Sequence, residues 1–304
     1  MKRKLSYLLL ILATLCWGAA FVVIKVGTAG FSPYAFLAWR YLLAALALGL
    51  CFPRLLTRIA PATLRAGLVL SLPLAAGTVI QTIGLGLTSA SNTAFITGMT
   101  LIFLPLLKFF LEGLRLQRVT LLANAIALTG LAILTVKLPL VFNRGDLWVL
   151  ASTLAYALHI ILTGRFVRHA DPMALSLVQL AGCGLLCTLP GLVNGSGLPL
   201  PPSAQVWQAI VFTGLLATAF TYTAQVVAQQ HLEDHKVALI FLLEPVFGCL
   251  AANLFLHEPF SLRLLLGGGL ILAAITLAEL RASGPLTLYP AEGMILNQEQ
   301  TGDD

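Results

Sequence analysis

A chain of 304 residues that is 59% hydrophobic and only 10% charged cannot cover itself with polar surface in water, since soluble domains are typically about 25% charged. The mean hydropathy of +0.94 therefore excludes an ordinary soluble protein and favours a membrane protein. The formal net charge of +6 does not indicate nucleic-acid binding, because the basic residues lie between apolar runs and form no basic patch.

Long stretches of the chain carry no Asp, Glu, Lys or Arg. They are Leu5–Ile24, Ala66–Leu107, Val119–Val136, Leu147–Gly164 and Pro172–Leu232. A helix needs about 20 mostly apolar residues to cross the hydrocarbon core of a bilayer, so each stretch is long enough for one or two crossings. The stretches are rich in Leu and Ala and lack the two-residue alternation of a membrane barrel. The pattern predicts an all-α polytopic membrane protein.

Ten transmembrane helices are predicted, five in each half of the chain. The first five are Leu5–Gly27, Pro33–Phe52, Thr63–Leu87, Thr93–Leu111 and Val119–Val136. The second five are Leu147–Val167, Pro172–Val193, Val206–Gln229, Val237–Leu256 and Leu262–Leu280. The polar segment 282–304 is predicted to be a disordered cytoplasmic tail.

The lysines and arginines between the helices predict the orientation, because cytoplasmic loops carry an excess of these residues. With the N-terminus inside, the inner side receives Lys2, Arg3, Lys4, Arg54, Arg58, Arg65, Lys108, Arg115, Arg118, Arg165, Arg168, Lys236 and Arg281. The outer side receives only Lys137, Arg144 and Arg263. We therefore expect both termini in the cytoplasm and the chain in the inner or plasma membrane.

The two halves resemble each other in register. A shift of 139 residues places Trp17 on Tyr156, and a shift of 140 places Pro105 on Pro245. Because each half has an odd number of helices, the second half must be inverted relative to the first, which is a common design of transporters. We divide the chain into a first repeat at residues 1–139 and a second repeat at residues 140–281.

Four segments carry a family resemblance. They are CWGAAFVVIKVG at Cys16–Gly27, SPYAFLAWRYLLAAL at Ser32–Leu46, LLEPVFGCLAANLFLHEP at Leu242–Pro259 and LLLGGGLILAAI at Leu264–Ile275. In these segments the chain resembles the EamA-type ten-helix members of the drug/metabolite transporter superfamily. The resemblance implies two inverted EamA repeats, a central cavity, and transport, often export, of amino acids, other metabolites or drugs. One departure is that the first repeat has Arg118 where the second has Glu258.

Ionisable residues inside the predicted spans are the first candidates for function, because charge is costly in a bilayer and often marks a solute pathway. Arg40 would either anchor a carboxylate or cap the ends of neighbouring helices. Glu244, beside Pro245, would bind and release a proton or gate the pathway, or it would be a fixed partner for a backbone group. Lys25 would share that role or extend to the headgroups. His159 would contact solute or serve as a hydrogen-bonded packing residue.

Aromatic and amide side chains form the second set of candidates. Aromatic rings can stack on a planar or apolar solute, and amides can orient it by hydrogen bonds; alternatively, the same groups would bond between helices without any solute. The predicted substrate-binding set is Trp17, Arg40, Gln81, Tyr156, His159, Gln179, Tyr222 and Gln225. Lys108 and Glu112, four residues apart on one helix, are expected to form a local ion pair.

These features favour a secondary transporter that exports an amino acid or a similar amphipathic solute by alternating access. The alternatives are an efflux carrier for drugs or other metabolites, a passive channel, and a membrane scaffold without transport. No enzyme motif such as HExxH or GxSxG occurs, and we expect no catalytic residue, metal or cofactor. The expected partners are the solute and the lipid bilayer, with no nucleic acid and no ATP-binding subunit, and the protein would be a monomer or a homodimer.

Overall fold

The computed structural model describes residues 2–57, 59–113, 118–135, 143–256 and 262–281, and every regular element in these ranges is helical. The elements are α1 (Lys2–Gly27), α2 (Pro33–Cys51), α3 (Pro53–Leu56), α4 (Pro61–Leu87), α5 (Ala90–Gly98), α6 (Thr100–Glu112), α7 (Arg118–Thr135), α8 (Arg144–Phe166), α9 (Pro172–Val193), α10 (Ala204–Gly214), η1 (Leu215–Phe220), α11 (Thr221–Gln229), α12 (Asp234–Phe241), α13 (Leu243–Leu256) and α14 (Leu262–Arg281).

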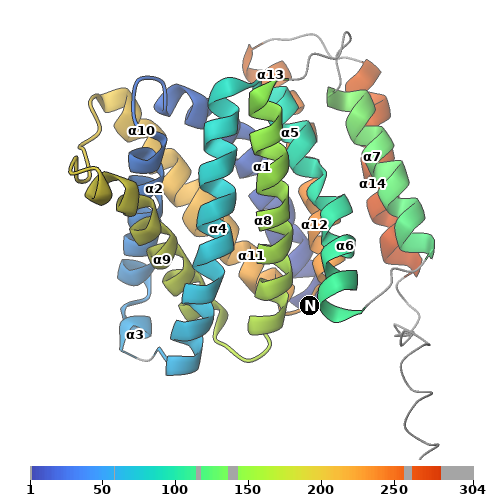
Figure 1. Ribbon diagram of the computed structural model, residues 1–304. Helices are drawn as coiled ribbons and strands as arrows, with labels where there is room; N and C mark the ends of the chain where they lie inside the picture. Colours follow the sequence, from blue (N-terminus) through green and yellow to red (C-terminus); the bar gives the residue numbers. More distant parts are fainter. Residues whose placement is uncertain (1, 58, 114–117, 136–142, 257–261, 282–304) are drawn as a thin grey trace, which may run out of the picture.

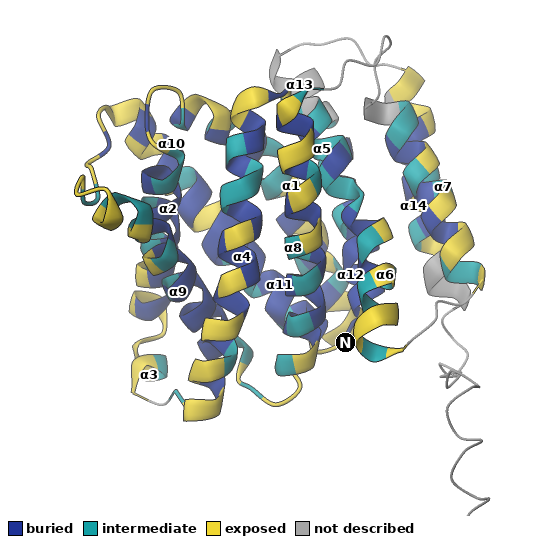
Figure 2. Cartoon of the chain, in the orientation of Figure 1, coloured by how far each residue is buried: buried dark blue, intermediate teal, exposed yellow. Residues whose placement is uncertain are grey.

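The protein is an all-α polytopic membrane protein. Among the described residues, 7 helical stretches are long and apolar enough to cross a bilayer, and shorter apolar helices accompany them. Large hydrophobic side chains such as Leu50, Phe110 and Leu185 are exposed, whereas polar residues such as Gln225 and Asp146 are buried. Figure 2 shows exposed residues on the outer sides of the helices and buried residues facing inward. This arrangement suits a lipid solvent.

Helices of the two halves interleave. Within the bundle, α4 packs on α8 and α9, while α11 packs on α1 and α10 packs on α2. Helix α4 is the third span of the first half, and α10 and α11 belong to the third span of the second half. Each third span thus packs on the first two spans of the other half, as an inverted repeat requires. The pair α7 and α14 lies at one side (Figure 1). Helix α1 begins and α14 ends at one end of the bundle, which we call the N-terminal face; the other end is the opposite face.

Two of the predicted spans are interrupted. The fourth, predicted as Thr93–Leu111, consists of α5 and α6, which meet at Met99. The ninth, predicted as Val237–Leu256, consists of α12 and α13, which meet at Leu242. At each junction a backbone N–H bonds three residues back, from Met99 to Ile96 O at 2.9 Å and from Leu242 to Leu239 O at 3.2 Å. The fourth span is thus present, at Asn92–Glu112, and both predicted stretches are helical but interrupted by one residue each.

A proline follows each interruption at a short distance. Pro105 lies inside α6 and Pro245 lies in the first turn of α13. Proline has no N–H to donate to the carbonyl four residues earlier. That carbonyl for Pro105 belongs to Leu101, and it accepts instead from Asn124 Nδ2 of α7 at 3.4 Å. Near the first break, a neighbouring helix thus supplies the partner that the proline removes.

The eighth span contains a π-helical turn. Helices α10 and α11 are joined without a gap by η1, so the span runs from Ala204 to Gln229. Thr218 Oγ1 donates to Thr213 O, five residues earlier, at 2.8 Å. Single π-helical turns are rare and occur often at functional sites. The sequence prediction of a regular helix at Val206–Gln229 missed this turn.

Helix α1 approaches α13 closely at Gly18. A Cβ added at Gly18 would lie 2.7 Å from Glu244 O and 2.8 Å from Gly248 N. Only glycine allows this contact between backbones, as at many helix crossings in membranes. The approach places Trp17 of the first half beside the start of α13, where Glu244 lies.

Candidate functional site

A cavity lies between the two halves of the bundle. It includes about 900 Å³ of space not filled by protein atoms, a figure that also counts the open space at its mouth. Its walls come from α1, α2, α4, α5 and α6 of the first half and from α8, α11, α12 and α13 of the second. The candidate residues at its surface are Trp17, Arg40, Gln81, Tyr156, His159, Tyr222, Gln225 and Glu244. The fold therefore brings together most of the side chains selected from the sequence.

Arg40 is buried at the cavity and contacts the π-helical turn. Its Nε donates to Thr218 Oγ1 at 2.5 Å, and its Nη2 donates to Ala217 O at 3.0 Å. A guanidinium has five N–H donors in a fixed plane, so these two bonds orient the group. Arg40 thus supports the backbone of the π-helical turn and also lines the cavity.

Trp17 bonds the same carbonyl as Arg40, that of Ala217, and its ring belongs to an aromatic cluster. Its Nε1 donates to Ala217 O at 3.0 Å. Its ring packs edge-on against Tyr222, with centroids 5.5 Å apart, and against Phe241, at 4.9 Å. Sequence reasoning missed Phe241, because an apolar residue in an apolar span carries no signal. Together these rings give one wall of the cavity an aromatic surface.

Polar groups of both halves meet through Gln81. Tyr156 of α8 donates its hydroxyl to Gln81 Oε1 at 2.9 Å, and Gln81 Nε2 donates to Thr97 Oγ1 at 2.8 Å. The three residues come from α8, α4 and α5 and all line the cavity. Their bonds connect the halves, and the same groups are hydrogen-bonding partners within reach of a bound solute.

Gln179 does not line the cavity but supports a residue that does. His159 Nε2 lies 2.9 Å from Gln179 Oε1, so the imidazole donates and Gln179 accepts. The His159 ring stands perpendicular to Tyr222, with centroids 5.9 Å apart. Gln179 and His159 are both buried. The structure thus places Gln179 behind the cavity wall, where it orients the imidazole.

The two residues predicted for proton coupling or gating lie apart. Glu244 lines the cavity in the first turn of α13, directly after the helical break. Lys25 lies outside the cavity at the end of α1, and its Nζ donates to Thr88 O at 2.8 Å. Glu258, which resembles the family motif, lies outside the described residues. Among the two predicted residues, therefore, only Glu244 can contact a solute in the cavity.

The predicted local ion pair between Lys108 and Glu112 is wrong. Lys108 Nζ pairs with Asp234 Oδ2 at 2.5 Å, and Arg165 Nη2 pairs with Glu112 Oε1 at 2.8 Å. Each pair joins α6 of the first half to a helix of the second. Local spacing predicts partners along one helix, but here the neighbouring helices offer opposite charges. Among the described residues, no three His, Cys, Asp or Glu gather closely enough to hold a metal ion.

Comparison with known proteins gives a consistent result. A model of the EamA-like transporter family matches twice, at residues 4–136 and 143–280. An uncharacterized transporter of Archaeoglobus fulgidus is 25% identical over 280 residues, covering 92% of this chain and 87% of that protein. The uncharacterized transporter YoaV of Bacillus subtilis is 24% identical over 278 residues, with 88% and 94% covered.

A solved crystal structure shares the fold at a TM-score of 0.72 and 17% identity, and the match covers 90% of this chain and 96% of that one. The two matches of the family model leave only a short segment between them and cover nearly all the described helices. The protein with this interleaved bundle and its central cavity belongs to the EamA-like transporter family.

Proposed function

We propose that the protein is a secondary transporter that exports an amino acid, or a similar amphipathic solute with a carboxylate, by alternating access. The observation that carries this proposal is the cavity between the halves, with Arg40 on one half and Glu244 on the other. A guanidinium binds a carboxylate through two parallel hydrogen bonds. A carboxylate on the facing half is a counterpart for an ammonium group or a site for a coupled proton.

The bilayer topology completes the proposal. The chain lies in the inner or plasma membrane with both termini in the cytoplasm, and residues 1–139 and 140–281 act as inverted repeats around the cavity. It operates as a monomer or homodimer without an ATP-binding subunit. The remaining predicted residues contact the solute directly or, for Gln179, through His159.

A second candidate function is efflux of drugs or other planar metabolites. The cluster of Trp17, Tyr222 and Phe241 favours it, because aromatic surfaces stack on planar and apolar molecules without demanding a particular charge. Solutes with and without a carboxylate distinguish the two candidates.

Counterflow in proteoliposomes tests the proposal. Vesicles loaded with one solute should accelerate uptake of the same labelled solute, and the panel should contain zwitterionic amino acids, monocarboxylates and planar cations. We expect exchange of carboxylate-bearing solutes, with Arg40→Gln lowering it about tenfold through loss of the two-point contact. An absence of exchange for every solute, with folded protein in the vesicles, would reject a transporter.

Thr218→Val is the matched control for Arg40. It removes the hydroxyl that Arg40 Nε contacts but leaves the guanidinium charge. If Thr218→Val lowers exchange as much as Arg40→Gln, Arg40 serves the π-helical turn and not the solute. Glu244→Gln should abolish proton-driven accumulation while leaving exchange measurable; retention of full accumulation would reject coupling through Glu244.

A further inference from the structure

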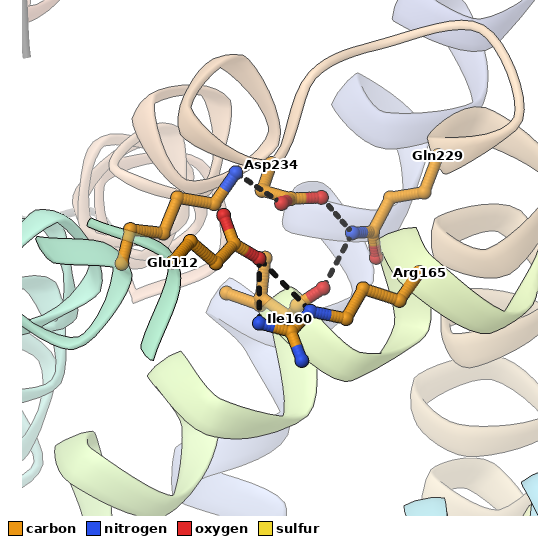
Figure 3. Close-up of polar contacts among 6 residues, drawn as sticks. Glu112, Ile160, Arg165, Gln229 and Asp234 are labelled. Atoms are coloured by element: carbon orange, nitrogen blue, oxygen red, sulfur yellow. Dashed lines mark hydrogen bonds and ion pairs between the residues drawn. The ribbon is translucent and has the colours of Figure 1, made fainter. Parts of the chain in front are cut away.

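A polar network lies at the N-terminal face, beyond the residues already assigned to the cavity. Figure 3 shows Glu112, Ile160, Arg165, Gln229 and Asp234 turned toward one another from α6, α8, α11 and α12. We give the name latch to three residues of this network, Lys108, Gln229 and Asp234. Two of them belong to the second half and Lys108 belongs to the first.

Asp234 is the centre of the latch. Its Oδ2 pairs with Lys108 Nζ at 2.5 Å, and its Oδ1 accepts from Gln229 Nε2 at 3.0 Å. Gln229 Nε2 also donates to Ile160 O of α8 at 2.8 Å. Asp234 and Gln229 are buried, whereas the Lys108 side chain is 19% exposed; the bonds between Asp234, Gln229 and Ile160 are therefore more shielded from water than the ion pair.

The surface of α8 is shaped for the Asp234 carboxylate. A Cβ added at Gly164 would lie 2.0 Å from Asp234 Oδ1, closer than any real contact. The missing side chain of Gly164 therefore provides the space that the carboxylate occupies. This space lets the Asp234 carboxylate lie against α8 while it pairs with Lys108 of α6.

The latch lies between the cavity and the N-terminal face. Ala238, Ile160 and Gln225 line the cavity on α12, α8 and α11. Asp234 and Gln229 lie four residues from Ala238 and Gln225 on the same helices, which is about 6 Å along each axis at 1.5 Å per residue. The latch therefore lies on the side of the cavity that faces the N-terminal face.

Gln225 connects the latch to the cavity. Its Nε2 donates to Gln229 Oε1 at 3.0 Å, and Gln225 itself lines the cavity. A solute that takes the Gln225 N–H now accepted by Gln229 Oε1 would break this hydrogen bond, whereas one that uses the second N–H of the amide would leave it in place. Occupancy of the cavity by the first kind of solute would in this way weaken the support that Gln229 gives to Asp234.

Both sides of the latch belong to helical segments that end at a break. Lys108 lies on α6, which begins after Met99, and Asp234 lies on α12, which ends before Leu242. Short segments bounded by breaks can move as units, because hinges lie at element ends. Separation of Lys108 from Asp234 would then separate the two halves at this face.

We propose that Lys108, Gln229 and Asp234 close the solute pathway at the N-terminal face, and that Gln225 couples this closure to the contents of the cavity. The inference deepens the proposed transport function and rests on it. The pair Glu112–Arg165 lies at the rim of the same closure, where Arg165 is more exposed.

Thiol labelling from one side tests the latch. The probe is a membrane-impermeant maleimide, applied to vesicles that expose the N-terminal face, and the reporter is Ala238→Cys in full-length protein whose five native cysteines are replaced. We expect Asp234→Asn and Lys108→Gln each to raise the labelling rate about tenfold by shifting the closed population. Gln225→Leu should raise it about threefold, because it removes only the support of Gln229.

Glu233→Gln is the matched control, since it removes the same charge from the neighbouring exposed residue and should leave the rate unchanged. Unchanged labelling in both Asp234→Asn and Lys108→Gln would overturn the latch. If Asp234→Asn does not fold, Lys108→Gln on the other half decides alone. Unchanged labelling in Gln225→Leu would overturn the coupling.

Counterflow distinguishes a failure of the latch proposal from a failure of the proposed transport function. Wild-type protein that exchanges solute while the variants label at the wild-type rate would reject the latch and keep the transporter. Wild-type protein that exchanges no solute would reject the transporter, and faster labelling in the two latch variants would still support closure of the cavity by these residues.

Discussion

The two ends of the bundle are held by polar clusters of different chemistry. At the N-terminal face, opposite charges of the two halves pair, Lys108 with Asp234 and Arg165 with Glu112. At the opposite face, the carboxylate of Asp146 accepts from neutral groups, the Thr88 hydroxyl at 2.6 Å and the Asn143 backbone N–H at 3.0 Å.

The repeat places these clusters at related positions. Adding 140 to Lys25 gives Arg165, and adding 141 to Thr88 gives Gln229. Each face thus uses the ends of corresponding helices, but the partners differ. Lys25 reaches a backbone carbonyl, whereas Arg165 reaches a carboxylate. The two halves thus place corresponding helix ends at opposite faces, and we expect the different bonds there to make the two faces open with different free energies.

The largest expected effect of a substitution concerns the less exposed of the two ion pairs, Lys108–Asp234, whose side chains are 19% and 11% exposed. Lys108→Met should lower the free energy of unfolding by about 3 kcal/mol, because it leaves the Asp234 carboxylate unpaired. Thermal unfolding in detergent measures this loss. Arg165→Gln is the comparison at the same face and should cost less than about 1 kcal/mol, since the Arg165 side chain is 44% exposed. Equal losses would show that burial does not separate the two pairs.

The next largest loss of stability is expected from adding a methyl group at Gly164. Gly164→Ala should destabilise the protein by about 2 kcal/mol through overpacking, because the new methyl group would overlap the Asp234 carboxylate. Gly86→Ala is the matched control on α4, where an added Cβ meets no atom within 4 Å. Differential scanning calorimetry of the two variants should show a lower melting temperature for Gly164→Ala alone; equal melting temperatures would contradict the fit.

The smallest of the three effects is expected at the opposite face. Thr88→Val removes a hydroxyl that donates to the Asp146 carboxylate and accepts from Asn143 Nδ2 at 3.1 Å, and it should cost about 1.5 kcal/mol, the low end for a hydrogen bond to a charged group. Thr129→Val is the control, because the Thr129 hydroxyl is exposed and bonds only its own helix at Ala125 O. If Thr88→Val lowered the free energy of unfolding as much as Lys108→Met, the proposed difference in stability between the two faces would be wrong.

Most helices could be predicted from the sequence, because hydrocarbon thickness and uncharged runs set their length directly. The seventh span was predicted as Pro172–Val193 and is observed with these bounds, since Asp171 caps its first turn and Pro172 occupies the first helical position. The breaks at Met99 and Leu242 were missed, because a proline allows either a kink or a break. Packing against other helices decides between these two, and spacing along one chain does not contain that information.

The candidate site was predictable to the extent that polar residues inside apolar spans must face protein or water. That rule selected Arg40, Gln81 and Gln225, which do line the cavity. It could not distinguish a residue that lines the cavity from one that only contacts a lining residue, as Gln179 contacts His159. It also could not find the pairing of Lys108 with Asp234, because the partners lie on different halves and only the tertiary fold brings them together.

The π-helical turn at Leu215–Phe220 has a consequence for the register of the eighth span. An α-helix advances 3.6 residues per turn, so one extra residue within a turn rotates everything after it by about 100°. Tyr222 and Gln225 follow the turn and face the cavity. Deleting one residue after Thr218 in η1 would therefore redirect both side chains without altering either, while Arg40 could still bind Ala217 and Thr218.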